Sequence, residues 1–229
     1  MSDSYPNLFA PAGLTFAIWG VIYLALAGYV LYQFGLMQKD KTDIQRASDQ
    51  KVRLLFIVSS LANSIWIFAW HFRLIPLTLV LMLVLLVSLA AINLTTGRQT
   101  YEAGGKIFVR LPFAIYFGWI TVATIANVTT LLVDLQWGGA GLSEQAWTIL
   151  ILLAGLLIGW ITMVFLKNIA YGLVLIWAYT GILLKHLSAS GFDGQYPGVI
   201  VTVIGCLVLY AIALIVVVVR GRKGDGIRK

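Results

Sequence analysis

The sequence predicts an all-α integral membrane protein, built as a bundle of seven transmembrane helices. The chain has 229 residues, of which 60% are hydrophobic and 11% are charged, and its mean hydropathy is +0.93. Soluble proteins carry about 25% charged residues, so a chain this apolar cannot cover a surface that faces water. The apolar residues also fall into separate stretches of the length, about 20 residues, that a helix needs to cross the hydrocarbon core.

Seven stretches meet this length, and short or charged segments separate them. Pro76 predicts a tight turn after the second stretch, because proline disfavours helix in the residue before it. Lys167 and Asn168 predict a second tight turn, and the charged segment 36–53 is expected to extend a helix out of the membrane. The predicted spans are residues 13–35, 54–73, 75–96, 108–133, 146–166, 168–187 and 198–219.

The basic residues predict how these spans are oriented. All but two of the 16 Lys and Arg residues, Arg73 and Lys185, lie in segments that a seven-span chain places on one side. Cytoplasmic loops carry such an excess of Lys and Arg. An even number of spans would separate the two most basic segments, 36–53 and 220–229. The sequence therefore predicts an amino terminus outside and a carboxyl terminus in the cytoplasm.

The spans carry little of the chemistry that enzymes and ion-coupled transporters use. No Asp, Glu or Lys falls in the middle of a span, whereas proton relays and ion-coupled transport depend on such groups. The motifs of serine hydrolases, zinc proteases and phosphate-binding loops are missing. We therefore expect no catalytic residue, metal ligand or obligatory cofactor, which counts against an enzyme without excluding one. The net charge of +7 is explained by membrane topology, so no nucleic-acid partner is expected.

Ring and amide side chains remain, at helical spacing on the first, second and fourth spans. Each set occupies one face of its helix. An amide in hydrocarbon costs free energy unless it finds a partner, so these faces should turn toward protein or a cavity. From the pattern alone, packing between helices is favoured over a ligand pocket. The candidate ligand-binding residues are Trp19, Tyr23, Asn63, Trp66, Tyr116, Trp119, Ala123 and Asn127.

These residues resemble motifs of the TspO/translocator protein family, the tryptophan-rich sensory or peripheral benzodiazepine receptor proteins. Trp119, Ala123 and Asn127 reproduce the spacing of the family's last span. The stretch 61–66, LANSIW, is similar to its LxLNxxW segment, and the stretch 17–23, AIWGVIY, is similar to its APxWxxLYxxMG segment. The three matches occur in the family's order and cover residues 9–133.

The resemblance implies two parts within a single membrane domain. Residues 1–133 would form a TspO-like unit of four helices, and residues 134–229 would add three helices and a basic tail. The family has five spans, of which the first has no counterpart here. Its members are implicated in binding tetrapyrroles such as protoporphyrin and, in mitochondria, sterols. The resemblance thus implies a receptor or transporter for a flat hydrophobic molecule, with a tetrapyrrole as the ligand, and shifts the balance toward a pocket.

Other functions stay open at this point. The chain could be a permease or facilitator of small hydrophobic solutes, a light-dependent porphyrin-degrading protein that uses tryptophan as its redox-active group, or a membrane scaffold. Gly155 and Gly159 form a GxxxG pattern, which lets helices approach closely and leaves a homo-oligomer open. Trp137 and Trp147 flank an acidic loop and are interpreted as an interfacial aromatic belt. Membrane lipid is the expected surrounding, in a bacterial cytoplasmic (inner) membrane.

Overall fold

The computed structural model describes residues 7–34 and 43–226, and the regular elements in these ranges are all helices. Seven helices of this described part are long and apolar enough to cross a membrane, which confirms the predicted fold class. The chain is therefore an integral membrane protein. The candidate spans are Gly13–Gln33, Gln45–His71, Ile75–Gly97, Ala103–Asp134, Glu144–Leu166, Ile169–Leu187 and Pro197–Arg220.

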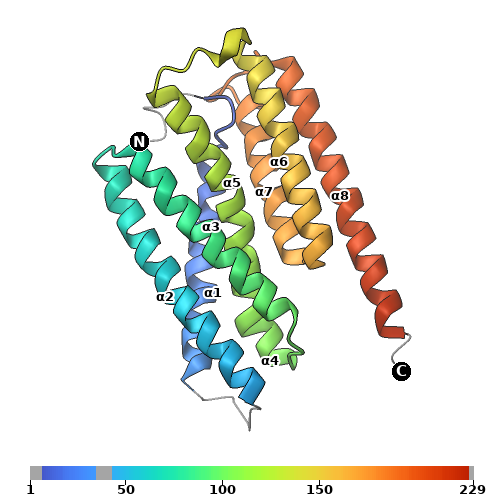
Figure 1. Ribbon diagram of the computed structural model, residues 1–229. Coiled ribbons are helices and arrows are strands. Elements are labelled where there is room, and N and C mark those ends of the chain that lie inside the picture. The colour runs from blue at the N-terminus through green and yellow to red at the C-terminus, as the bar shows by residue number, and fades with distance from the viewer. Residues whose placement is uncertain (1–6, 35–42, 227–229) are drawn as a thin grey trace. The chain divides into compact units, whose positions relative to one another are not determined.

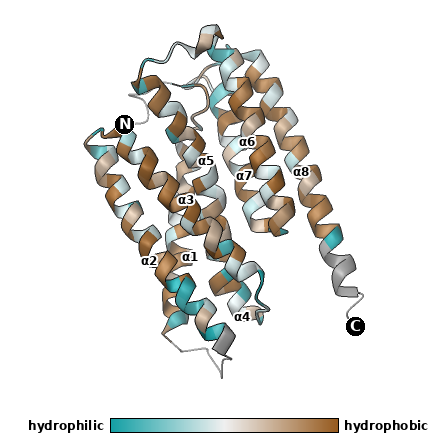
Figure 2. Ribbon diagram, viewed as in Figure 1, coloured by the Kyte–Doolittle hydropathy of each residue, from teal (hydrophilic) through white to brown (hydrophobic). Residues whose placement is uncertain are grey.

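The helices follow the predicted order (Figure 1). A 3₁₀ turn, Gly13–Ala17, leads into the first, and a π-helical segment, Lys106–Arg110, joins α4 to α5. Figure 2 shows hydrophobic colour along most of each long helix and hydrophilic colour around α4. The helices are α1 Ile18–Gln33, α2 Asp43–His71, α3 Ile75–Gly97, α4 Ala103–Gly105, α5 Leu111–Asp134, α6 Glu144–Leu166, α7 Ile169–Leu187 and α8 Pro197–Gly226.

Both predicted tight turns are present, and each contains a residue in the left-handed region. Arg73 (φ 56°) ends the α2 segment, and Lys167 (φ 49°) ends α6. The next helix then begins at a residue suited to that place. Asn168 caps α7, because its side-chain oxygen accepts a hydrogen bond from the backbone N–H of Tyr171 at 3.2 Å. Pro76 lies in the first turn of α3, where a missing N–H costs nothing.

The described residues divide into two compact units. One is Ala17–Thr124, called here the 17–124 unit, and the other is Ile125–Lys229 together with Met1–Phe16, called the 125–229 unit. Helix α5 begins in the first unit and ends in the second. The division into 1–133 and 134–229 that the motifs imply stays a prediction.

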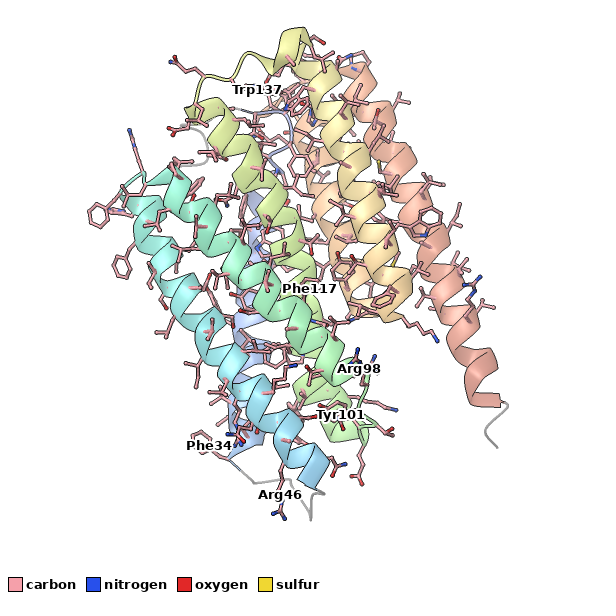
Figure 3. The ribbon with its side chains drawn as sticks, viewed as in Figure 1. Phe34, Arg46, Arg98, Tyr101, Phe117 and Trp137 are labelled. Atoms are coloured by element: carbon pink, nitrogen blue, oxygen red, sulfur yellow. The ribbon has the colours of Figure 1, made fainter. Side chains whose placement is uncertain are left out.

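The 17–124 unit contains α1 to α4 and the first part of α5. Within it α2 packs along α3, and α1 packs against the π-helical segment. Arg46 and Arg98 lie at the same end of this unit as Tyr101 (Figure 3). That arrangement agrees with the predicted basic side, but which side faces the cytoplasm stays a prediction. Several basic residues on which it rests lie outside the described residues: Lys39, Lys41, Arg228 and Lys229.

In the 125–229 unit, two buried tyrosines on α7 and α8, called here the tyrosine pair, form hydrogen bonds with α6. The hydroxyl of Tyr179 donates to the backbone oxygen of Leu152 at 2.8 Å, and that of Tyr210 donates to Gly155 at 2.9 Å. Both acceptors lie on α6. A Cβ added at Gly155 would lie 2.5 Å from the Tyr179 hydroxyl, and one at Gly159 would lie 2.6 Å from that of Tyr210. The GxxxG pattern thus makes room for tyrosines of the same chain.

The amino-terminal segment of this unit lies along α7. The backbone N–H of Ala12 donates to Gly181 at 2.9 Å, and the indole Nε1 of Trp177 donates to the backbone oxygen of Thr15 at 3.0 Å. Gly181 is required there, because an added Cβ would overlap the Thr15 side chain. These contacts attach the segment around Ala12 and Thr15 to α7.

Candidate functional site

Trp19 on α1 stands at the centre of a group of rings in the 17–124 unit. Its ring centroid lies 5.5 Å from Tyr23, 6.5 Å from Trp66, 5.9 Å from Tyr116 and 6.3 Å from Trp119. These distances fall within the range in which aromatic rings attract one another. Trp70 adds a further ring, 5.7 Å from Trp66. These six residues are called here the Trp19 cluster.

The cluster forms because helical spacing brings each pair of rings to one face. Trp19 and Tyr23 are one turn apart on α1, Trp66 and Trp70 are one turn apart on α2, and α5 supplies the other two rings. The structure therefore brings together the predicted aromatic residues of three separate helices. Trp70, which follows the same spacing on α2, joins them. Their role in binding a ligand stays a prediction.

Two kinds of ring geometry occur around Trp19. The planes of Tyr23, Trp19, Trp66 and Trp70 are nearly parallel from one ring to the next, at 26°, 30° and 23°. The α5 rings instead meet Trp19 edge-on, at 66° for Tyr116 and 84° for Trp119. The near-parallel series presents flat apolar ring faces, and the two α5 rings contact Trp19 with their edges.

Burial differs sharply across the cluster. Tyr116 and Trp119 are each only 2% exposed, whereas Tyr23 is 47% exposed. The α5 side is therefore sealed, and the near-parallel series is reachable at its Tyr23 end. Any flat molecule that stacks on these rings would approach from that end.

Some polar atoms in this region are buried with no hydrogen-bond partner among the described residues, and two of them lie on α2. They are the side-chain oxygen Oδ1 of Asn63 and the indole Nε1 of Trp66. The Asn63 amide nitrogen does have a partner, because it donates to the Tyr23 hydroxyl at 3.3 Å. A buried polar group left unpaired costs about 1–3 kcal/mol, and membrane interiors offer no water to replace the partner. One unused donor and one unused acceptor therefore lie one turn apart on α2.

A third asparagine, Asn93 on α3, shows what a purely structural amide looks like in this unit. Its amide nitrogen donates to the backbone oxygens of Leu89 at 2.9 Å and Phe113 at 3.0 Å, so it ties α3 to α5. Asn93 is not among the residues predicted from the sequence, because no ring accompanies it at helical spacing on α3. A polar residue alone in an apolar span was the available signal.

The last two predicted site residues lie further along α5. Ala123 is half-buried, one turn beyond Trp119 in the 17–124 unit. Asn127 is buried, but it belongs to the part of α5 that falls in the 125–229 unit. Its contribution to the site stays a prediction. Within residues 7–34 and 43–226, no group of three or more His, Cys, Asp or Glu residues is placed to hold a metal ion.

The family comparison agrees with the motifs that form this cluster. The family model described as "TSPO-like protein" matches residues 1–219, nearly the whole chain. The chain belongs to the TSPO-like protein family. The match extends beyond residues 9–133 and takes in α6, α7 and the apolar part of α8. No curated protein and no solved structure matches this TSPO-like chain.

Proposed function

We propose that this TSPO-like chain binds a flat hydrophobic small molecule, a tetrapyrrole such as protoporphyrin, at the Trp19 cluster, for sensing or transport. The observation that carries the proposal is the pair of unpartnered buried atoms, Trp66 Nε1 and Asn63 Oδ1, beside a near-parallel series of rings. Rings alone are explained by packing. An unused donor and acceptor in hydrocarbon are explained by a ligand that pairs with them.

The chemistry of a tetrapyrrole suits these groups. Its flat face stacks on indole and phenol rings, which contributes about 0.5–1.5 kcal/mol per aromatic pair beyond the buried area. Its carboxyl side chains can accept from Trp66 Nε1 and, when protonated, can donate to Asn63 Oδ1. The exposed ring of Tyr23 supports an approach from the lipid side of α1. We place the protein in a bacterial cytoplasmic membrane, with the basic ends of its helices inside.

The test is a titration of the purified protein with protoporphyrin, followed by its Soret absorbance. We expect a saturable change that Trp66→Phe weakens about fivefold, because this variant keeps a ring and removes only the N–H, worth about 1 kcal/mol. Asn63→Leu should weaken it to a similar degree. Trp177→Phe is the matched control, since that indole already donates to Thr15 within the protein. It should leave the affinity unchanged.

Two outcomes would overturn the proposal: no saturable Soret change, or equal affinities in Trp66→Phe, Asn63→Leu and the parent chain. Illumination of the bound complex then separates binding from degradation. Bleaching of the porphyrin to a product would favour the light-dependent enzyme. Flux of porphyrin across proteoliposomes would favour the permease.

A further inference from the structure

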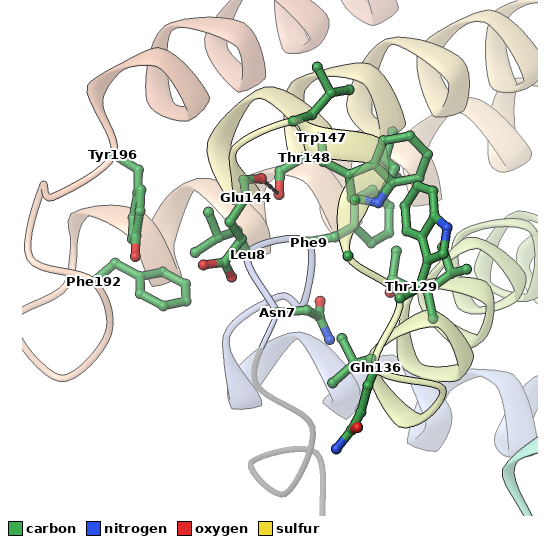
Figure 4. A pocket seen from close by; sticks show the side chains of 17 residues that line it. Asn7, Leu8, Phe9, Thr129, Gln136, Glu144, Trp147, Thr148, Phe192 and Tyr196 are labelled. Atoms are coloured by element: carbon green, nitrogen blue, oxygen red, sulfur yellow. Dashed lines mark hydrogen bonds between the residues drawn. The ribbon is translucent and has the colours of Figure 1, made fainter.

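A second candidate site lies in the 125–229 unit and uses none of the residues of the Trp19 cluster. It is an open pocket of about 640 Å³. The amino-terminal segment, the α5–α6 loop, the first turns of α6 and the α7–α8 loop all contribute to its walls (Figure 4). It is called here the Glu144 pocket.

Aromatic rings from four different stretches of the chain line this pocket. Trp137 and Trp147 meet with their centroids 4.7 Å apart at 62°, and Phe192 and Tyr196 meet at 5.4 Å and 87°. Phe9 adds a ring from the amino-terminal segment. The face of such a ring carries negative charge density and attracts cations. Lys185 already makes this kind of contact outside the lining, with its Nζ 5.7 Å from the Phe192 centroid.

Glu144 is the one carboxylate, ammonium, guanidinium or imidazole side chain among the residues that line the pocket, all of which are described. The Thr148 hydroxyl donates a hydrogen bond to the backbone oxygen of Glu144 and not to the Glu144 carboxylate. No ion pair or hydrogen bond from the described residues reaches that carboxylate. Figure 4 shows the Glu144 side chain directed toward the space between Leu8 and Phe192.

The charges around the pocket also favour a positively charged ligand. Asp134 and Asp193 are exposed and each adjoins a lining residue in the sequence, and the ammonium of Lys185 lies over the ring of Phe192. Helix dipoles do not reverse this balance, because α5 and α7 end near the pocket whereas α6 and α8 begin there. Their partial charges therefore oppose one another.

We infer that the Glu144 pocket binds an organic cation with an apolar body, an ammonium group attached to an aromatic or alkyl skeleton. The carboxylate neutralises the ammonium, and the rings surround both the cation and its apolar body. This arrangement uses the same physics as aromatic cages for quaternary ammonium ligands. An anion of the same shape would lie against a carboxylate and the negative faces of the rings.

The test uses two water-soluble probes of equal skeleton and opposite charge, benzyltrimethylammonium and benzylsulfonate. Binding is measured by isothermal titration calorimetry on the full chain in nanodiscs, with empty nanodiscs as the baseline. We expect saturable binding of the cation and none of the sulfonate. Glu144→Gln should weaken binding of the cation about fivefold, the upper range for an exposed ion pair. Trp147→Leu should weaken it about fivefold by removing one ring face.

Glu102→Gln is the matched control, because it removes an exposed carboxylate from the 17–124 unit and should change nothing. Near-equal affinity for both probes would overturn the inference, as would cation binding that survives both Glu144→Gln and Trp147→Leu, or no saturable binding at all. Circular dichroism and gel filtration establish that each variant is folded. Porphyrin binding should be unchanged in Glu144→Gln, so the two sites can fail independently.

Discussion

The Trp19 cluster and the tyrosine pair are both groups of aromatic rings between helices, yet their buried polar atoms differ in whether they have hydrogen-bond partners. Each tyrosine hydroxyl donates to a backbone oxygen of α6, and a glycine provides the space in which it lies. Trp66 Nε1 in the cluster and Asn63 Oδ1 beside it are buried without a hydrogen-bond partner in the described part of the chain. A satisfied group stabilises a fold, whereas an unsatisfied one reduces stability and needs another explanation.

This contrast separates a structural aromatic group from a candidate binding site when both consist of aromatic rings. Ring contacts do not distinguish them, because both regions have centroids at ordinary distances. The two regions are distinguished by which of their buried donors and acceptors have hydrogen-bond partners. Trp177, whose indole is partnered, belongs with the tyrosine pair on this measure, and Trp66 does not.

The largest effect on stability should come from replacing a glycine that contacts the tyrosine pair with a larger residue. Gly159→Leu forces side-chain atoms into the space of Leu175 and the Tyr210 hydroxyl, both 2.6 Å from an added Cβ. We expect the free energy of unfolding to fall by about 3 kcal/mol, the upper range for overpacking. Thermal unfolding in detergent measures it. Gly205→Leu on α8 is the control, since nothing lies within 4 Å of that position, and an equal loss there would refute the assignment.

A smaller effect should follow from removing the tyrosine hydroxyls. The double variant Tyr179→Phe with Tyr210→Phe keeps both rings and deletes two hydrogen bonds between helices. We expect a loss of about 2 kcal/mol, at about 1 kcal/mol for each bond. Trp66→Phe, measured in the same way without ligand, should change stability little because its N–H has no partner to lose. A loss in Trp66→Phe as large as in the double variant would erase the distinction between the two regions.

The smallest effect compares two asparagines of the 17–124 unit. Asn93→Leu should lower the free energy of unfolding by about 1 kcal/mol, because the hydrogen bonds from its side chain to the backbone oxygens of Leu89 and Phe113 are lost. Asn63→Leu should lower stability less, because the hydrogen bond that it loses to Tyr23 is offset by the removal of a buried oxygen without a partner. Chemical unfolding of both variants measures the contrast. The reverse order would mean that Asn63 is a structural amide.

Much of the fold could be predicted because it depends on local properties. A span is recognised from its own run of apolar residues, and the turns at Arg73 and Lys167 lie where a proline or a polar pair interrupts two such runs. The faces of α1, α2 and α5 that carry rings also follow from helical periodicity. The contact of those faces around Trp19 agrees with the expectation, although ligand binding stays to be tested.

The rest depends on which distant residues meet, and spacing along the chain does not encode that. The GxxxG pattern indicated a close approach to α6, but not that Tyr179 and Tyr210 would fill it. Asn93 gave no signal of its partner Phe113. Trp137 and Trp147 were interpreted as an interfacial belt, a role that stays a prediction, and the structure adds that they line a pocket with Glu144.

Hydropathy and helical periodicity are properties of each segment alone, so the amino acids predict the membrane class, the seven spans and the ring-bearing faces. Which polar atoms are paired depends on how the helices pack. A hydrogen bond requires two groups within about 3 Å, and residues 55 positions apart, such as Tyr210 and Gly155, reach that distance only after their helices have packed.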